Sequence, residues 1–523
     1  MPRGSARPTY IDLFSGCGGA SVGFHDAGFE CLLAVDLDQH AVNCYNSNFP
    51  PRRGRPTAVR ADLSQITSHE DVFRFLEDHG VHERFCDVIV GGPPCQSFSS
   101  VGQTKVAALL REDEARRETW TEIVRTRTML FEAYALFVEA LAPRWILFEN
   151  VPTIRSHETY PLIEQRFENL QRADGAQLRY NLHRENHWAS DYGVPQRRRR
   201  FIMVGARQDL GVVWQRPRKT TGPVVLHAIG DLPAVRAGHR TASISYSQQQ
   251  LSEYQSRMRQ GLPEEQATLV TAHICRSHNA DDIQLFEQMG PGARFSDDAV
   301  QAAILAINPD HKLIKYSTEK FQDKLHKLDP DKHAWTVTAH LQKDCYKFIH
   351  FRDARTVTVR EAARLQSFPD RFRLPEVLGI AFRMVGNAIP PLLAEAFATS
   401  FCHSDRRIGS SDDRARAIVP DQAWQQLAPR FELTLPRRRR GSRRVSNRVV
   451  VAAGVLRAYC GWSRQAVGEY FGYHQNTLGT KIQAVLQSGL WDFTERVLAR
   501  AAIIPPEELE LPPEYEGGQM AAD

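Results

Sequence analysis

A short apolar run that ends in two glycines and two prolines constrains the fold of this chain more than any other stretch. The run, Asp87–Val90, is mostly β-branched and apolar, which predicts a fully buried strand. Gly91–Pro94 end that strand and hold Cys95 on a stiff loop at its carboxyl end. In open α/β sheets, ligands bind at the carboxyl ends of the strands. Cys95 is therefore a candidate nucleophile, and a buried structural cysteine in a proline-rich turn is an equal alternative.

The N-terminal region predicts a strand that runs into a glycine-rich turn. Tyr10–Phe14 has strand residues, and Ser15–Gly19 predicts a tight turn into a helix. Because glycine lets a ligand approach the backbone closely, this turn indicates a nucleotide-type cofactor. Ala20–Ser21 stands where the dinucleotide fingerprint has its third glycine, which disfavours a pyrophosphate ligand. The next strand, Cys31–Val35, ends at Asp36, at the distance where an acid binds ribose hydroxyls.

Two later strands also deliver acidic residues. Ala58–Ala61 precedes Asp62, and Trp145–Phe148 precedes Glu149. An acid at the end of a strand often only caps the next turn, and this alternative is stronger for Asp62. Glu149 and Cys95 are expected at the same edge of one sheet, where a carboxyl group can act as an acid catalyst.

A run of four arginines leads into another strand, Phe201–Val204. Strand alternation sends Gln196, Arg198 and Arg200 to one face, where the arginines point inward and need anionic partners. The alternative is a plain basic surface run.

Composition excludes several classes of protein. The 523 residues are enough for two or three domains, and no apolar run approaches the roughly 20 residues of a membrane span. Nine cysteines without a Cys-x-x-Cys pair argue against a disulfide framework and a zinc site, so we expect no metal and a reducing cytoplasm. The first nine residues lack the apolar core of a signal peptide. The net charge is only +5, but arginines cluster at residues 197–200 and 437–444, which suits a polyanionic partner.

Taken in order, these motifs resemble those of the cytosine-5 DNA methyltransferases, from about Thr9 to about Thr399. The resemblance rests on the sequences PPCQ at residues 93–96, ENV at 149–151, QRRRR at 196–200, TVREAARLQSFP at 358–369 and VGNAIPP at 385–391. It implies a Rossmann-like α/β methyltransferase core with a smaller target-recognition lobe, S-adenosylmethionine as cofactor, and double-stranded DNA as partner. The family flips its target base out of the helix.

The resemblance also implies the roles of individual residues. Cys95 is the expected nucleophile, Glu149 the acid that holds the cytosine ring, and Arg198 the residue that steadies the cytosine carbonyl. The expected cofactor-binding residues are Phe14, Ser15, Gly16, Gly18, Gly19, Asp36, Asp62, Pro93 and Asn387. We expect the helix after Thr358 to be capped and to pack the recognition lobe onto the core.

The chain divides into a core, a recognition region and an extension. The core covers residues 8–213 and 335–403, and the recognition region covers 214–334, whose target sequence cannot be deduced. Residues 404–444 predict a basic linker, 445–502 a helical domain with the spacing of a helix-turn-helix, and 503–523 a disordered tail. The helical domain either binds DNA or is a plain dimerisation element.

The favoured function is DNA cytosine-5 methylation in restriction-modification or phage defence. A transfer-RNA methyltransferase shares these motifs, normally with a shorter recognition region. A non-catalytic DNA-binding regulator is disfavoured by the intact set of Cys95, Glu149 and Arg198. Enzymes that methylate amino groups of DNA lack the cysteine after the two prolines.

Overall fold

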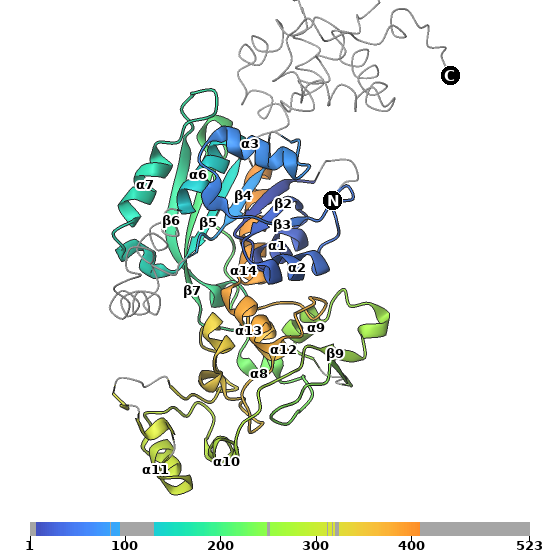
Figure 1. Ribbon diagram of the computed structural model, residues 1–523, viewed down its shortest axis with the longest axis vertical. Coiled ribbons are helices and arrows are strands. Elements are labelled where there is room, and N and C mark those ends of the chain that lie inside the picture. Colours follow the sequence, from blue (N-terminus) through green and yellow to red (C-terminus); the bar gives the residue numbers. More distant parts are fainter. Residues whose placement is uncertain are drawn as a thin grey trace, which may run out of the picture. The chain divides into compact units, whose positions relative to one another are not determined.

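The computed structural model describes residues 7–83, 85–94, 130–247, 251–310, 312–315, 317–319 and 324–407 (Figure 1). Cys95 and the predicted C-terminal segments beyond residue 407 lie outside these residues. One compact unit contains the chain up to Val81, Phe85–Ala206 and Gln215–Cys402. Residues 215–334 of the predicted recognition region thus belong to the same compact unit as the core, and the following paragraphs concern that unit.

Within the described residues, seven strands form the main sheet in the order β3-β2-β1-β4-β5-β7-β6. They are β1 (Thr9–Leu13), β2 (Glu30–Asp36), β3 (Ala58–Arg60), β4 (Val88–Gly91), β5 (Trp145–Asn150), β6 (Tyr180–Trp188) and β7 (Arg199–Arg207). The first five strands in sequence pair in parallel, and β7 pairs antiparallel with β5. The predicted α/β fold is confirmed. The strand order reverses direction between β1 and β4, which is where open sheets of this kind bind ligands.

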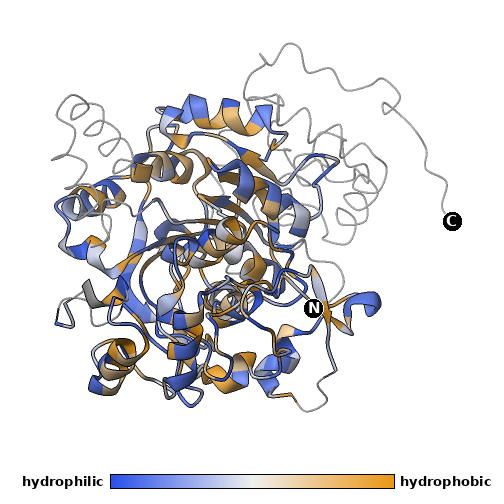
Figure 2. Cartoon of the chain, turned by 60° about the horizontal axis from the view of Figure 1, so that its bottom comes forward, coloured by the Kyte–Doolittle hydropathy of each residue, from blue (hydrophilic) through white to orange (hydrophobic). Residues whose placement is uncertain are grey.

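Helices cover both faces of this sheet (Figure 1). One face carries α3 (His69–Asp78), α6 (Leu130–Leu141) and α7 (Tyr160–Glu168), and the other carries α1 (Gly19–Asp26), α2 (Gln39–Asn48) and α14 (Pro391–Arg407). Side chains of α3, α6 and α7 form one apolar core with β1, β2, β4 and β5. Many helices mix hydrophilic and hydrophobic residues (Figure 2), as expected for helices with one buried side.

Helix α14 brings the end of the described chain back against its beginning. Phe401 of α14 stacks on Trp145 of β5, with ring centroids 5.1 Å apart, and also lies near Phe24 of α1. A Cβ added to Gly23 would lie 2.3 Å from the carbonyl oxygen of Pro391, so only glycine allows α1 to lie this close. The helix continues through residues 404–407, where the sequence predicted the start of a linker.

The recognition region contains short elements joined by long connections. They are α8 (Val225–Ile229), β8 (Ser243–Ser245), α9 (Glu253–Met258), β9 (Leu269–Thr271), α10 (Ala280–Gln288) and α11 (Asp298–Ile307). The chain then forms α12 (Val359–Leu365) and α13 (Leu378–Asn387). The 3₁₀ turns are η1 (Leu63–Gln65), η3 (Pro152–Ser156), η4 (Ala189–Asp191), η5 (Gln208–Leu210), η6 (Glu264–Gln266), η7 (Lys312–Lys315), η8 (Ala339–Gln342) and η9 (Tyr346–Phe348).

Helix α12 joins the recognition region to the core, as the sequence predicted. Thr358 and Glu361 form the capping box at its start. Arg364 is fully buried and binds Asp370 at 2.6 Å and Asp231, near α8, at 3.1 Å. A buried arginine is tolerated only when carboxylates neutralise it, so these ion pairs fix the position of α12.

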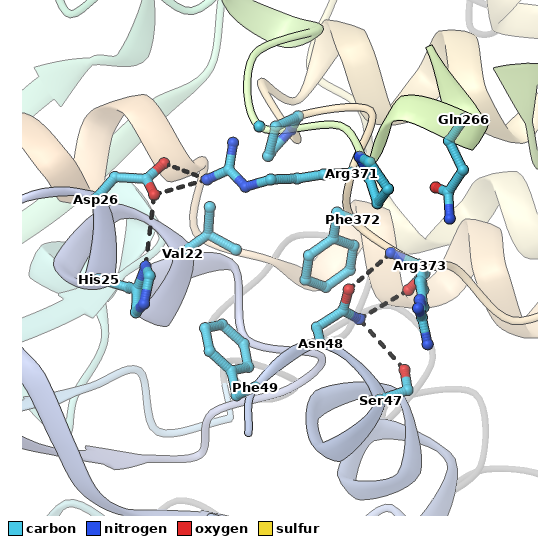
Figure 3. A pocket seen from close by; sticks show the side chains of 13 residues that line it. Val22, His25, Asp26, Ser47, Asn48, Phe49, Gln266, Arg371, Phe372 and Arg373 are labelled. Carbon is cyan, nitrogen blue, oxygen red and sulfur yellow. Dashed lines mark hydrogen bonds and ion pairs between the residues drawn. The ribbon is translucent and has the colours of Figure 1, made fainter. Parts of the chain in front are cut away.

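A cavity of about 300 Å³ lies where α1 and α2 end (Figure 3). The carboxylate of Asp26 binds Arg371 at 2.6 and 2.7 Å on one side of it. On the other side, the amide of Asn48 exchanges two hydrogen bonds with the backbone of Arg373, at 2.7 and 2.8 Å. These contacts fasten the segment after α12 to the core, at the end of α1 away from the glycine-rich turn.

Candidate active site

The turn after β1 has the left-handed backbone that a glycine-rich sequence allows. The φ angles of Phe14, Gly16 and Gly18 are 61°, 55° and 96°. Gly18 also has no room for a side chain, because a Cβ there would lie 2.7 Å from the ring of Phe49. Helix α1 begins at the next residue, Gly19. The turn therefore presents bare backbone at the carboxyl edge of the sheet.

Asp36 and Ser15 place polar atoms beside this turn. The carboxylate of Asp36 accepts hydrogen bonds from the backbone N–H groups of Gly16 and Asp38, both at 2.8 Å. Burial is the main cause that raises the pKa of Asp36. The Ser15 hydroxyl is buried without a hydrogen-bond partner among the described residues, and the space where Gly16 would carry a Cβ is open. A buried unpaired hydroxyl beside open space fits a polar ligand.

The other predicted cofactor residues lie at the ends of their elements. Asp62 accepts a hydrogen bond from the backbone of Ser64 at 3.0 Å and caps η1, which agrees with the capping alternative. Asn387 is the exposed last residue of α13. The carbonyl oxygen of Pro93 accepts a hydrogen bond from the Asn150 amide at 3.1 Å.

Glu149 lies at the end of β5 beside the glycine-proline loop. A Cβ added to Gly92 would lie 2.9 Å from the Glu149 Oε2 atom and 3.3 Å from the Glu149 carbonyl oxygen, so the loop passes directly beside Glu149. The hydrogen bond between Asn150 and Pro93 fastens this loop, which leads to Cys95, to the end of β5. The sequence expectation that Glu149 and this loop share one edge is confirmed, whereas Cys95 itself lies outside the described residues.

Arg200, which the sequence did not single out as catalytic, forms an ion pair with Glu149. Its Nε atom lies 2.8 Å from Oε1, and the two side chains are only 13% and 12% exposed. Ile202 is directly opposite Glu149 in the antiparallel pair β5–β7. Side chains two residues apart on a strand share a face, so Arg200 points toward the Glu149 carboxylate.

Arg198 instead lies in the interior, 1% exposed. Its guanidinium donates to the carbonyl oxygens of Val337 at 2.6 Å, Gly386 at 3.2 Å and Ala388 at 3.0 Å. It therefore holds the backbone on both sides of Asn387. The resemblance gave Arg198 a role toward the base, and its contacts fit a positioning residue better.

Gln196 continues this buried network. It donates to the carbonyl oxygen of Leu365 at 2.8 Å and accepts the backbone N–H of Val337 at 2.9 Å. The predicted alternation is confirmed, because Gln196 and Arg198 are buried while Arg197 is exposed.

Two further findings concern the described part of the chain. It contains no cluster of three or more His, Cys, Asp or Glu side chains placed to hold a metal ion. None of its helices has the length and apolar character needed to cross a membrane.

A doubly wound sheet with a glycine-rich turn facing an acid on the next strand is the arrangement of a cofactor-dependent α/β enzyme. The family model of the C-5 cytosine-specific DNA methylases matches residues 9–403. Similar proteins include the type II methyltransferase M.AgeI of Thalassovita gelatinovora, 31% identical over 74% of this chain and 97% of that protein. The type II methyltransferase M1.HphI of Haemophilus parahaemolyticus is 29% identical over 75% of this chain and 85% of its own length.

Among solved structures, a prophage-encoded Escherichia coli protein described as a DNA modification methyltransferase is 25% identical, with a TM-score of 0.57. The match covers 76% of this chain and 100% of that one. The chain belongs to the C-5 cytosine-specific DNA methylase family. It is accordingly an enzyme, a DNA (cytosine-5-)-methyltransferase.

Proposed function

We propose that this chain transfers a methyl group from S-adenosylmethionine to carbon 5 of cytosine in a specific sequence of double-stranded DNA, through a covalent adduct with Cys95. The observation that carries this proposal is the ion pair between Glu149 and Arg200. Glu149 lies against Gly92, which belongs to the loop that leads to Cys95. The ion pair supplies a carboxyl group and a cation beside the loop that leads to the candidate nucleophile.

The cofactor supplies a methyl group made electrophilic by a positively charged sulfur. Asp36 fits an acceptor for ribose hydroxyls, and the buried hydroxyl of Ser15 fits a partner for a polar cofactor group. The bare turn at Gly16 lets a nucleoside approach the backbone. The remaining residues proposed to bind the cofactor are Phe14, Gly18, Gly19, Asp62, Pro93 and Asn387.

The proposed chemistry divides among three side chains. A stacked cytosine is out of reach, so it must leave the helix, which costs a few kcal/mol. The Cys95 thiolate then forms a bond to carbon 6, because the thiolate is the reactive form of cysteine. Glu149 holds ring nitrogen 3 through a proton and offsets the charge that develops there, which makes carbon 5 nucleophilic. Arg200 orients Glu149 and faces the cytosine carbonyl.

Release restores the enzyme. Once carbon 5 carries the methyl group, its proton leaves to a base and the bond between carbon 6 and the Cys95 sulfur breaks. In this scheme Arg198 is a positioning residue, because it holds the backbone on both sides of Asn387.

The biological setting follows from the relatives. The two named above are type II methyltransferases, which supports a role in restriction-modification or phage defence in the cytoplasm. We place the recognition of the DNA sequence in residues 214–334.

Expression of the full chain in cells lacking other cytosine methylation, followed by bisulfite sequencing, tests this function. Wild type should protect cytosine in one sequence context, and Cys95→Ala should protect none. Cys402→Ala, a change at a cysteine outside the proposed site, should leave the pattern intact. DNA containing 5-fluorocytosine should trap wild type covalently, because fluorine cannot leave as a cation. Turnover by Cys95→Ala above a few per cent of wild type would rule out the nucleophile.

A further inference from the structure

Two exposed tryptophans carry arginines over their rings, two arginines in one case and one in the other. Trp188 at the end of β6 is 38% exposed, and the guanidinium carbons of Arg197 and Arg199 lie 5.6 and 5.7 Å from its ring centroid. Trp335 is 44% exposed, with the Arg294 guanidinium carbon 5.1 Å from its centroid. We call these five residues the tryptophan–arginine track.

The arginines of the track have no carboxylate partner within the described ranges. Arg197, Arg199 and Arg294 are exposed, and none forms an ion pair there. Arg74, another exposed arginine, differs from them because it binds Glu70 of the same helix at 3.0 Å. Unpaired surface cations that stack on aromatic rings are typical of surfaces that bind nucleic acid.

Trp335 is held in place although nearly half of it is exposed. Its Nε1–H donates to Nε2 of His326 at 3.1 Å, and the two rings meet nearly edge to face at 73°. Burial is the main cause that lowers the pKa of His326 to about 4, so at neutral pH this nitrogen is free to accept. An exposed aromatic side chain in one fixed orientation is a preformed stacking surface.

A cavity of about 400 Å³ lies between Arg197 and Trp335. Arg294, His326 and Lys332 also line it. Asp329 and Asp331 line it too, and Lys332 is paired with Asp329 at 2.7 Å, so Arg197 and Arg294 are the lining cations without a carboxylate partner among the described residues. A cavity of this size, with an aromatic wall and two such cations, has room for one nucleotide and groups that can hold it.

The wall of the cavity is tied to Arg197, three residues before Arg200 of the proposed active site. The backbone N–H of Arg197 donates to the carbonyl oxygen of Ala334 at 2.8 Å, and the Thr336 hydroxyl donates to the carbonyl oxygen of Arg197 at 2.7 Å. Arg197 and Arg200 are three residues apart, so their Cα atoms are separated by at most about 11 Å. This Cα separation corresponds to about three nucleotides of a DNA strand, which rises about 3.4 Å per nucleotide.

We propose that the tryptophan–arginine track binds the DNA strand flanking the target cytosine, with one nucleotide seated in the cavity against Trp335. The three arginines neutralise phosphates of that strand. This inference rests on the proposed function and names the surface that holds its DNA substrate close to the catalytic residues.

Fluorescence anisotropy with a labelled duplex of random sequence, over a range of salt concentrations and with the full chain, tests the track. Trp335→Ala should bind roughly 5- to 150-fold more weakly, the effect of removing one stacking aromatic, with an unchanged salt slope because the charge of the protein is the same. Trp335→Phe keeps an aromatic ring and should retain most of the affinity. Arg294→Ala should make the log–log salt slope shallower by about 0.9.

Matched controls separate these effects from general changes of the surface. Leu162→Ala removes another exposed apolar side chain, in α7 of the core, and Arg74→Ala removes an exposed arginine that is already paired; both should bind as wild type does. If both Trp335→Ala and Arg294→Ala bind DNA with the affinity and salt slope of wild type, the proposal that the track binds DNA is wrong. Binding to random duplex needs no methyl transfer, so a wild type that binds through the track but methylates no DNA would overturn only the proposed function.

Discussion

Replacing Arg198 with methionine separates the positioning role of this residue from a role toward the base. Methionine keeps an unbranched apolar stem but removes the donors that Arg198 supplies to the carbonyl oxygens of Val337, Gly386 and Ala388. Ala388 still accepts a hydrogen bond from the Gln366 amide at 2.8 Å. Two buried carbonyl groups are therefore deprived of the donor that Arg198 supplies.

The size of the effect follows from those two carbonyls. Each buried acceptor left without its donor costs about 1–3 kcal/mol, so the free energy of unfolding should fall by about 2–6 kcal/mol. This is a large share of the roughly 5–15 kcal/mol that stabilises a typical domain. Affinity for the cofactor should fall as well, because Arg198 fixes the backbone on both sides of Asn387.

Arg200→Met is the matched control, since the same residue type is changed two positions away. Its free energy of unfolding should fall by no more than about 3 kcal/mol, the value of one hydrogen bond between charged groups. Its turnover should fall by roughly 10²–10³-fold, as when a charge-stabilising donor is removed from an active site. Urea unfolding followed by tryptophan fluorescence and methyl transfer to DNA provide the two measurements. An Arg198→Met protein as stable as wild type but inactive would refute the positioning role.

Four further outcomes are expected. Glu149→Gln should lower turnover by roughly 10²–10⁴-fold because it cannot give up a proton, and normal turnover would exclude an acid role. Asp36→Ala should weaken S-adenosylmethionine binding by about 1–3 kcal/mol in calorimetry, and unchanged affinity would remove Asp36 from the site. Burial raises the pKa of Asp12 from 3.8 to about 7, so between these two pH values the folded state binds more protons than the unfolded state. Stability should therefore fall as pH rises from about 4 to 7, more in wild type than in Asp12→Asn, when thermal midpoints are compared. A chain ending after Arg407 should methylate the same sequence. The log–log salt dependence of its DNA affinity should be shallower by about 0.9 for each phosphate that the removed residues neutralise. Complete loss of activity with the fold intact would place the tail in the catalytic unit.

The parallel part of the sheet could be predicted because its strands are buried on both faces. Such strands are continuous apolar runs, and Asp87–Val90 and Trp145–Phe148 both became central strands. The position of the loops after these strands could be predicted too, because parallel strands present their carboxyl ends at one edge of the sheet. The proximity of Glu149 to Gly92 was predictable on this ground alone.

The antiparallel edge could not be deduced in the same way. β6, Tyr180–Trp188, alternates with many polar residues and lies at the sheet edge, so its sequence lacks an apolar run. The direction and register of β7 are set by tertiary pairing, and together they bring Arg200 rather than Arg198 beside Glu149. The alternation of Gln196, Arg198 and Arg200 indicated the correct face but not which arginine reaches the edge.

The packing of α14 against α1 has a consequence for synthesis of the protein on the ribosome. Phe24 and Trp145 emerge early, yet the aromatic ring that packs against both belongs to Phe401. At roughly 5–20 residues per second, Phe24 waits on the order of 20–75 s before Phe401 has been made. During that interval one face of the nascent sheet lacks α14, one of the three helices that cover it. A ribosome that stalls before α14 is complete therefore leaves a chain with an exposed apolar face, a natural substrate for chaperones rather than an early methyltransferase.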